Sequence, residues 1–457
     1  MRYMIRNSLF TSNSKLIARF LQRLVTVGAA ALVLFLVLHI FDYLYVKEDN
    51  WTRILWHNYY RAENIDNVFL GSSHVHCDID PFILDEMNGM ENFNMSIPFM
   101  RLNGAYYVLR EMAGDHDLKN VYLELYYVPS TGEWGDVMSD VSLQWNWNIT
   151  DHMRPSINKI QFMLSMSRRD KYLDTLFPFI RYREHIFDTP YISEQVGLKT
   201  SDDYRNYKLR YENENGEPTL EYRDKGYHYN LGEMPEYTMA YPQEINLQTE
   251  GAMPSNTEEY LRKIIEYCQE KDIGITLFIN PIYETQILST IDYDDYHQQI
   301  LTIADEYEIP FYDFNLCKSE YLDIMRRENF ADAGHLNSVG AELFTPFLWE
   351  VLSGDSESNQ EYFCQTYGEK ILLDAPETYG LYYFYDGDAR EYTIASNRET
   401  EIEYKVTATT EEGEERIIQD FCVNKEFELR NSEHGMLTIV SRIKEQPEEL
   451  LTLEIKY

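Results

Sequence analysis

Positive charge is scarce in this sequence. Its 457 residues include 40 Lys and Arg against 77 Asp and Glu, which leaves a formal net charge of −37. An acidic surface repels phosphate groups, so the composition argues against binding of nucleic acid, or of an anionic membrane surface, through the protein's own electrostatic field. A neutral or cationic substrate is compatible with this charge.

Cysteine is also scarce, and its placement argues against two further classes of protein. The five cysteines lack the paired spacing of a zinc site or a disulfide framework: Cys77, Cys268, Cys317, Cys364 and Cys422. His74 and His76 stand two residues apart, but the sequence offers no clear third ligand beside them. We therefore expect no metal and no cofactor. An exported chain without a disulfide framework fits the surface of a Gram-positive bacterium.

The first 46 residues have the pattern of a membrane anchor. Residues 1–23 contain basic side chains and no acidic one, and an almost unbroken apolar run from Leu24 to Phe41 follows. As a helix this run spans about 27 Å, close to the thickness of a bilayer core. The positive-inside rule makes residues 1–23 a cytoplasmic tail and places the body outside the cell. The alternative, a buried core helix, leaves the charge asymmetry unexplained.

No small-residue cleavage motif follows the apolar run, because residues 40–45 are bulky. Residues 24–46 are therefore predicted to be an uncleaved transmembrane signal anchor. The expected location is the cell membrane, with a single pass and an extracellular catalytic domain.

Residues 47–355 show strands alternating with helices. Runs of β-forming residues predict strands at 68–70, 92–95, 121–128, 275–279 and 310–314. Helices are predicted to begin after Asp80-Pro81, at a Ser255/Glu258 capping box, and after a cap at Asn337 or Ser338. This alternation predicts an α/β domain with a parallel sheet, whose ligand sites lie beyond the carboxyl ends of the strands.

Two segments depart from the α/β pattern. Residues 129–250 form an aromatic-rich insertion without clear strand alternation, and its Trp134, Trp145 and Trp147 either pack on the core or stack on sugar rings. Residues 370–457 contain several short alternating runs separated by turns, which predicts a β-sandwich accessory domain.

Two fragments carry the candidate chemistry. Gly71-Ser72-Ser73-His74 follows the first predicted strand, and Asp332-Ala333-Gly334-His335 precedes the last predicted helix. A serine hydroxyl needs a base to become a nucleophile, so His335 is the candidate base and Asp332 the group that orients it. Backbone N–H groups where the strand meets the helix can stabilise an oxyanion. Taken alone, Ser73 is also compatible with a tight turn, and His335 with a polar helix start.

These fragments resemble the SGNH (GDSL-like) hydrolase superfamily. Within it, residues 67–128 and 255–352 are similar to membrane-anchored envelope members related to the D-alanyl-lipoteichoic acid biosynthesis protein and to polysaccharide O-acetyltransferases. The resemblance implies a flavodoxin-like three-layer fold, with Ser73, Asp332 and His335 as catalytic residues. The usual Gly-Asp-Ser is Gly-Ser-Ser here. The family's glycine after strand two and asparagine after strand three are missing, which leaves Ser96, Asn94 and His74 as candidate oxyanion or substrate-binding residues.

The expected activity is that of an extracytoplasmic serine acyl esterase or O-acyltransferase, acting on a cell-envelope glycopolymer through an acyl-Ser73 intermediate. The expected partners are the membrane, a cell-wall glycopolymer or acylated carbohydrate, and an acyl-exporting membrane protein; nucleic acid is not expected. The alternative is a catalytically inactive SGNH-fold envelope protein that binds glycan or scaffolds polymer modification.

Overall fold

The computed structural model describes residues 2–48, 50–234, 253–290, 292–386, 388–430, 432–444 and 446–457. The chain forms two compact units, Met1–Asp49 with Ser167–Tyr207, and Asn50–Met166 with Lys208–Tyr457. The end of the predicted insertion, from residue 235, lies outside the described residues.

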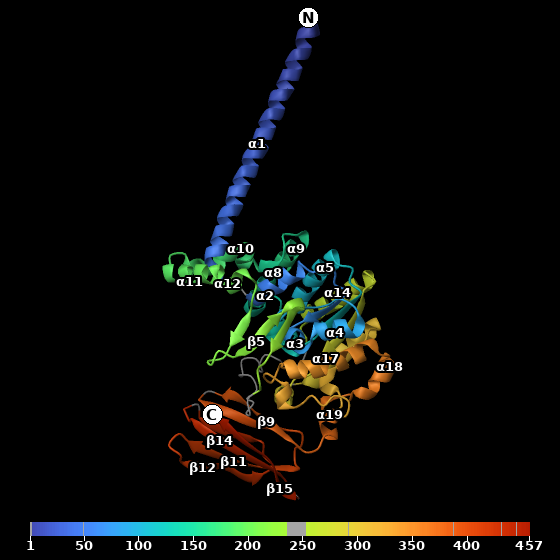
Figure 1. Cartoon of the computed structure of the whole chain (residues 1–457), viewed down its shortest axis with the longest axis vertical. Helices are drawn as coiled ribbons and strands as arrows, with labels where there is room; N and C mark the ends of the chain where they lie inside the picture. The colour runs from blue at the N-terminus through green and yellow to red at the C-terminus, as the bar shows by residue number, and fades with distance from the viewer. Residues whose placement is uncertain are drawn as a thin grey trace. The chain divides into compact units, whose positions relative to one another are not determined.

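The first unit combines one long helix with a group of short ones. α1 (Arg2–Tyr45) contains the predicted apolar run, and its stretch Ile17–Tyr45 is long and apolar enough to cross a membrane. The short helices are η1 (Arg169–Lys171), α10 (Tyr172–Leu176), η2 (Pro178–His185), α11 (Thr189–Thr200) and α12 (Asp202–Arg205). They lie around the carboxyl end of α1 (Figure 1).

The second unit contains a parallel sheet of five strands. Its order is β2 (Asn92–Ser96), β1 (Asn67–Gly71), β3 (Asn120–Glu124), β7 (Gly274–Ile279) and β8 (Phe311–Asp313). All four neighbouring pairs are parallel, which confirms the predicted α/β class and the flavodoxin-like order. The strand order reverses at β1, the position at which such sheets bind ligands. The third predicted strand, 121–128, is too long, because β3 ends at Glu124 and the chain turns into α6 (Tyr127–Ser130).

Helices cover both faces of the sheet. Alternate side chains of one strand enter different cores: Val68 and Leu70 belong to one hydrophobic cluster and Phe69 to another. The first cluster includes side chains of α5 (Leu102–Asp115), α14 (Ser255–Glu270) and α16 (Tyr293–Tyr307). The second includes side chains of α3 (Ser73–Asp78), α4 (Pro81–Asn88) and α17 (Ser338–Ser353). Strands that are buried on both faces read as continuous apolar runs, as β1 and β7 do.

Helix capping follows the sequence in two places and departs from it in one. Asp80 accepts the N–H of Phe82 at 2.9 Å and caps α4, and Asn337 caps α17 through the N–H groups of Val339 and Gly340. The predicted capping box at Ser255 is wrong. Ser255 is already helical, the N-cap is Pro254, and no side chain caps α14.

The predicted insertion is mainly helical and ends in a small sheet. After α6 come α7 (Gly132–Gly135), α8 (Asp140–His152) and α9 (Ile157–Met166), and later β4 (Arg210–Glu212), β5 (Pro218–Arg223) and β6 (Tyr227–Asn230). Trp145 lies 5.1 Å from Phe99, ring centre to ring centre, and Trp147 packs against the first cluster. For these two indoles the structure favours core packing. α2 (Asn50–Tyr59) also packs on this core through Trp56.

The carboxyl-terminal strands form the predicted sandwich. One antiparallel sheet holds β9 (Thr378–Asp386), β10 (Ala389–Ser396) and β13 (Glu426–Arg430). The other holds β11 (Ile402–Thr410), β12 (Glu415–Cys422), β14 (Gly435–Ile443) and β15 (Gln446–Lys456). Inward side chains of both sheets share one hydrophobic cluster, with Tyr392 from the first sheet and Val406 from the second. Between the α/β domain and these strands lie α18 (Ser356–Asn359) and α19 (Tyr367–Leu373).

Gly226 joins the small sheet to the main one, and its replacement tests that junction. It has a φ of +78°, and a Cβ there would lie 1.9 Å from the carbonyl oxygen of Asn94. We expect Gly226→Ala to lower the free energy of unfolding by about 3 kcal/mol. Gly216→Ala, at a similar φ of +79° with no atom within 4 Å of the new Cβ, should cost about 1 kcal/mol. Denaturant unfolding of the full chain measures both, and equal losses would contradict the proposed close contact.

Candidate active site

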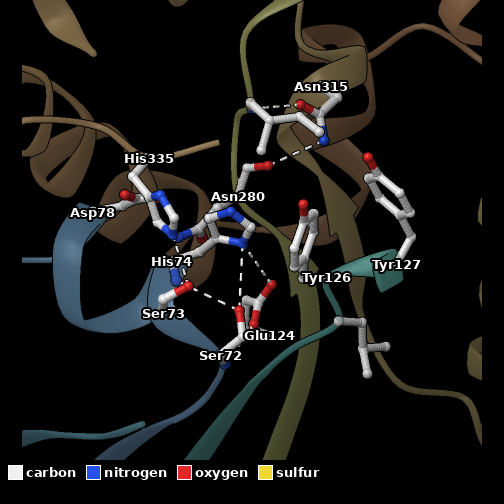
Figure 2. Close-up of polar contacts among 12 residues, drawn as sticks. Ser72, Ser73, His74, Asp78, Glu124, Tyr126, Tyr127, Asn280, Asn315 and His335 are labelled. Atoms are coloured by element: carbon white, nitrogen blue, oxygen red, sulfur yellow. Dashed lines mark hydrogen bonds and ion pairs between the residues drawn. The ribbon is translucent and has the colours of Figure 1, made fainter. Parts of the chain in front are cut away.

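The strand-to-helix turn places Ser73 at the carboxyl edge of the sheet. β1 ends at Gly71, Ser72 is the N-cap of α3, and Ser73 is the first residue of that helix. A Cβ at position 71 would lie 2.6 Å from Glu124 Oε2, so only glycine lets β1 end this close to β3. Ser73 Oγ lies 2.7 Å from His335 Nε2 (Figure 2). The two side chains are partly exposed, which leaves the hydroxyl accessible to a substrate.

His335 is held by Asp332 in the loop that precedes α17. The Nδ1 atom of His335 lies 3.0 Å from Asp332 Oδ1 and 3.1 Å from Oδ2. Asp332 Oδ1 also accepts the backbone N–H groups of Gly334 and His335, at 2.8 and 3.0 Å. The carboxylate therefore fixes both the loop and the orientation of the ring. Together with Ser73, these residues have the order of contacts of a nucleophile, a base and an orienting acid.

Electrostatics favour a charged His335 at neutral pH. Burial lowers the pKa of the imidazole, but the charge and hydrogen bond of Asp332, followed by the charges of Asp78 and Glu124, outweigh this and raise the pKa to about 9. For Asp332, burial raises the pKa, and the opposing charge and hydrogen bonds of His335 lower it to about 2. The imidazole gains its capacity to accept a proton as the pH rises towards 9.

A second layer of buried polar groups supports the turn, and sequence reasoning missed most of it. Glu124, at the end of β3, accepts the backbone N–H of Ser72 at 2.8 Å, and its Oε1 lies 3.6 Å from Nδ1 of His74. The His74 ring lies 4.9 Å from that of His335 and 4.0 Å from that of Tyr126 (Figure 2). Burial lowers the pKa of His74. The available signal for Glu124 was a charged residue within an otherwise apolar and aromatic strand.

Asp78 ties α3 to the loop that carries the base. Its Oδ1 accepts the backbone N–H of Leu336, and its Oδ2 accepts Nδ2 of Asn280, both at 2.9 Å. Burial raises the pKa of this carboxyl well above its ordinary value. The residue after His335 is thereby joined directly to the helix that begins with Ser73.

Two of the candidate oxyanion residues face α3 instead of the reacting groups. Asn94 donates its amide to the carbonyls of Val75 and Ile79, at 3.1 and 2.7 Å. Ser96 Oγ lies 3.0 Å from Nδ1 of His76. Within the part of the chain that the structure describes, the backbone N–H of Ser73 has no hydrogen-bond acceptor. That N–H is therefore a candidate donor to an oxyanion formed at Ser73.

One group of described side chains has the composition of a metal site. Ligand atoms of His76, Cys77 and His228 lie within 4.8 Å of one another, and all three residues are buried. His228, on β6, joins His76 and Cys77 in this group, and His74 of the sequence pair is not part of it. Burial keeps both imidazoles neutral by lowering their pKa values, and it raises the pKa of the thiol. The two rings also pack on each other and on Trp51, which is sufficient to explain their closeness.

A second His–Asp pair lies at the β8 edge, away from Ser73. It lines a cavity of about 620 Å³ that also includes Cys364. Nδ1 of His297 lies 3.0 Å from Asp313 Oδ2, but both oxygens of Asp313 also accept the hydroxyl of Tyr293. We interpret this pair as a support for the end of the strand.

The chain has only distant similarity to known proteins. No protein-family model matches the chain, and no curated protein does. Among solved structures, it is similar to a protein described as an acylhydrolase, from Bacteroides fragilis, with 9% identity and a TM-score of 0.30, over 65% of this chain and 93% of that one. A GDSL-like lipase from Bacteroides thetaiotaomicron has 10% identity and a TM-score of 0.30, over 66% and 97%. A protein described as a platelet activating factor, from Streptococcus pneumoniae, has 12% identity and a TM-score of 0.26, over 71% and 99%. Similarity at these scores does not define a function for this chain.

The charge of His335 predicts an alkaline pH profile. A base must be deprotonated to act, so we expect kcat/KM for an activated ester to rise with pH, with its midpoint near the pKa of about 9 and its plateau above that pH. Asp332→Asn removes the largest favourable charge, so the rise should move to lower pH while the plateau falls by about 10⁴-fold. A pH–rate profile of both chains checks this. A rise centred at the same pH in both would contradict the pairing.

Proposed function

We propose that the chain is a membrane-anchored SGNH-type serine acyl esterase or O-acyltransferase that acts outside the cell on an acylated cell-envelope glycopolymer. The observation that carries the proposal is the contact of Ser73 Oγ with His335 Nε2 at 2.7 Å, with Asp332 bonded to the opposite ring nitrogen. The parallel sheet and its strand order support the proposal, because such folds bind ligands beyond the carboxyl ends of their strands, and Ser73 follows the end of β1. Membership of the SGNH superfamily is part of the proposal.

In the proposed reaction, His335 takes the proton of Ser73 as the hydroxyl oxygen attacks the acyl carbonyl. The oxyanion of the tetrahedral intermediate accepts the backbone N–H of Ser73. His335 then returns the proton to the leaving alcohol oxygen, and the acyl group remains on Ser73. Water or a sugar hydroxyl attacks next, gives its proton to His335 and carries the acyl group away. Asp332 stabilises the imidazolium in both halves without changing its own protonation.

The proposed anchor favours a substrate that is assembled at the membrane. α1 would hold the catalytic domain beside the membrane, and the basic residues before the apolar stretch favour an extracellular domain. The proposed partners follow from this placement: a cell-wall glycopolymer or acylated carbohydrate, and an acyl-exporting membrane protein as the source of the acyl group. Hydrolysis and transfer use the same side chains and differ in whether water or a sugar hydroxyl reaches the acyl-enzyme.

One observation favours a second candidate, a catalytically inactive envelope protein that binds glycan. The Asn94 amide donates to backbone carbonyls of Val75 and Ile79, and the Ser96 hydroxyl contacts His76, which reduces the donors available to an oxyanion. Loss of one such donor lowers the rate by about 10²- to 10³-fold in serine hydrolases. The intact Ser73, His335 and Asp332 contacts favour the enzyme over this candidate.

A covalent probe separates the two candidates. We expect a fluorophosphonate to form an adduct with the full chain in detergent, and peptide mass spectrometry should place it on Ser73. Ser73→Ala should abolish the adduct and lower turnover of an activated acetyl ester by at least about 10⁴-fold. Ser72→Ala should still be labelled at residue 73, because the Ser72 hydroxyl lies against His74 and not against His335.

The second His–Asp pair supplies a matched control. His335→Gln should remove labelling, whereas His297→Gln, which changes an equally Asp-bonded histidine at the β8 edge, should leave it intact. The absence of a Ser73-dependent adduct together with the absence of ester turnover would overturn the enzyme proposal and favour the binding protein. Equal effects of the two histidine changes would point to folding instead of chemistry.

A further inference from the structure

The segment Ser167–Tyr207, which we name the collar, packs around the carboxyl end of α1 and binds its last carbonyl groups. Lys199, buried on α11, donates its ammonium group to the carbonyls of Tyr43 and Val46, at 2.8 and 2.7 Å. Tyr191 donates its hydroxyl to the carbonyl of Tyr45 at 2.8 Å. The last carbonyls of a helix have no partner within it, so these contacts replace the water that would otherwise solvate them.

These contacts fix the depth of the collar relative to the apolar run. The run ends at Phe41, whose ring lies 5.2 Å from that of Phe179 in η2. Asp42, the next residue, accepts the backbone N–H of Phe179 at 3.2 Å. If α1 spans a bilayer, the change from apolar to polar residues marks the headgroup level, and the collar is held at that level.

The exposed side chains and the net charge of the collar are compatible with a position at the headgroup level. Five of its large apolar or aromatic side chains are exposed: Tyr172, Leu173, Leu176, Phe187 and Leu198. Phe187 is 96% exposed, and a fully solvated phenyl group is unusual on a protein surface in water. The collar contains seven Lys or Arg and seven Asp or Glu, so it is neutral within a chain of net charge −37. It therefore escapes the repulsion that anionic lipid headgroups exert on the acidic body of the chain.

We propose that the collar is a second membrane-binding element, which lies in the outer lipid–water interface with the side chains of Leu173 and Phe187 among the acyl chains. Amphipathic segments with aromatic residues bind membrane interfaces in this way, through apolar area. The inference rests on the proposed anchor and goes beyond it, because the chain is then held by α1 and by a surface-lying segment that restricts its rotation about the helix.

Lipid crosslinking tests this contact directly. The full chain, with a photoreactive p-benzoylphenylalanine at position 187 or 173, is reconstituted into phosphatidylcholine vesicles and irradiated, and phospholipid adducts are quantified by mass spectrometry. Ile417 on β12, which is 59% exposed, is the matched control outside the collar. We expect at least ten times more adduct at 187 and 173 than at 417. An adduct yield that is equal with and without added phosphatidylglycerol would support binding through apolar area. Adducts that form only when phosphatidylglycerol is present would contradict it.

A probe at Val33, in the middle of the apolar run, separates failure of the collar from failure of the anchor. Adducts at 33 without adducts at 187 or 173 would overturn the collar proposal and keep the anchor. The absence of adducts at all three positions would overturn the anchor and the collar together. Neither outcome affects the fluorophosphonate result, which reports on Ser73 alone.

Discussion

The hydrogen-bonded series from Ser73 through His335 to Asp332 is the interaction on which the functional account depends. Ser73 and the Asp332–His335 loop come from distant parts of the sequence. Two sets of contacts join them: the series itself, and the carboxylate of Asp78 on α3, which accepts the backbone N–H of Leu336. The carboxylate of Asp332 has two tasks, since it shapes the loop by accepting backbone N–H groups and also charges the imidazole. The pairing with Asp332 orients the His335 ring, but it also keeps the ring protonated at neutral pH, where it cannot accept a proton from Ser73. This compromise sets the expected pH dependence.

Local patterns were enough to predict the elements that position the site. β1 and β7 are buried on both faces and read as apolar runs, and Asp80 and Asn337 are capping residues whose function depends only on the next few residues. The Gly-Ser-Ser-His and Asp-x-x-His fragments are equally local, which is why the sequence alone predicts Ser73, Asp332 and His335 as candidate site residues. Alternation of strands and helices predicts a parallel sheet, but the order β2-β1-β3-β7-β8 was implied by the family resemblance, because a long insertion separates β3 from β7.

The remaining parts of the site depend on contacts between distant segments. Glu124 lies beside Ser72 because β1 and β3 are neighbours, and no spacing in the sequence shows this adjacency. Asn94 and Ser96 lie in β2, and the packing of α3 against this strand determines that their side chains contact the α3 segment. The first unit is assembled from two separate stretches of the chain, so its collar was read as part of an insertion. The predicted start of α14 is wrong by one residue: Ser255, predicted as the N-cap, is the first helical residue, and Pro254 is the N-cap.

If the proposed anchor, collar and active site are all correct, the chain is an enzyme that meets its substrate at the cell surface. α1 would supply attachment, the collar would supply orientation, and Ser73 would supply the chemistry. The most direct test of this account is an NMR titration of the His335 ring in the full chain and in Asp332→Asn. The account predicts a pKa near 9 in the parent chain and a clear decrease in the variant. Titration of both near the ordinary histidine value of about 6.5 would show that the ring and the carboxylate are not paired, and would contradict it.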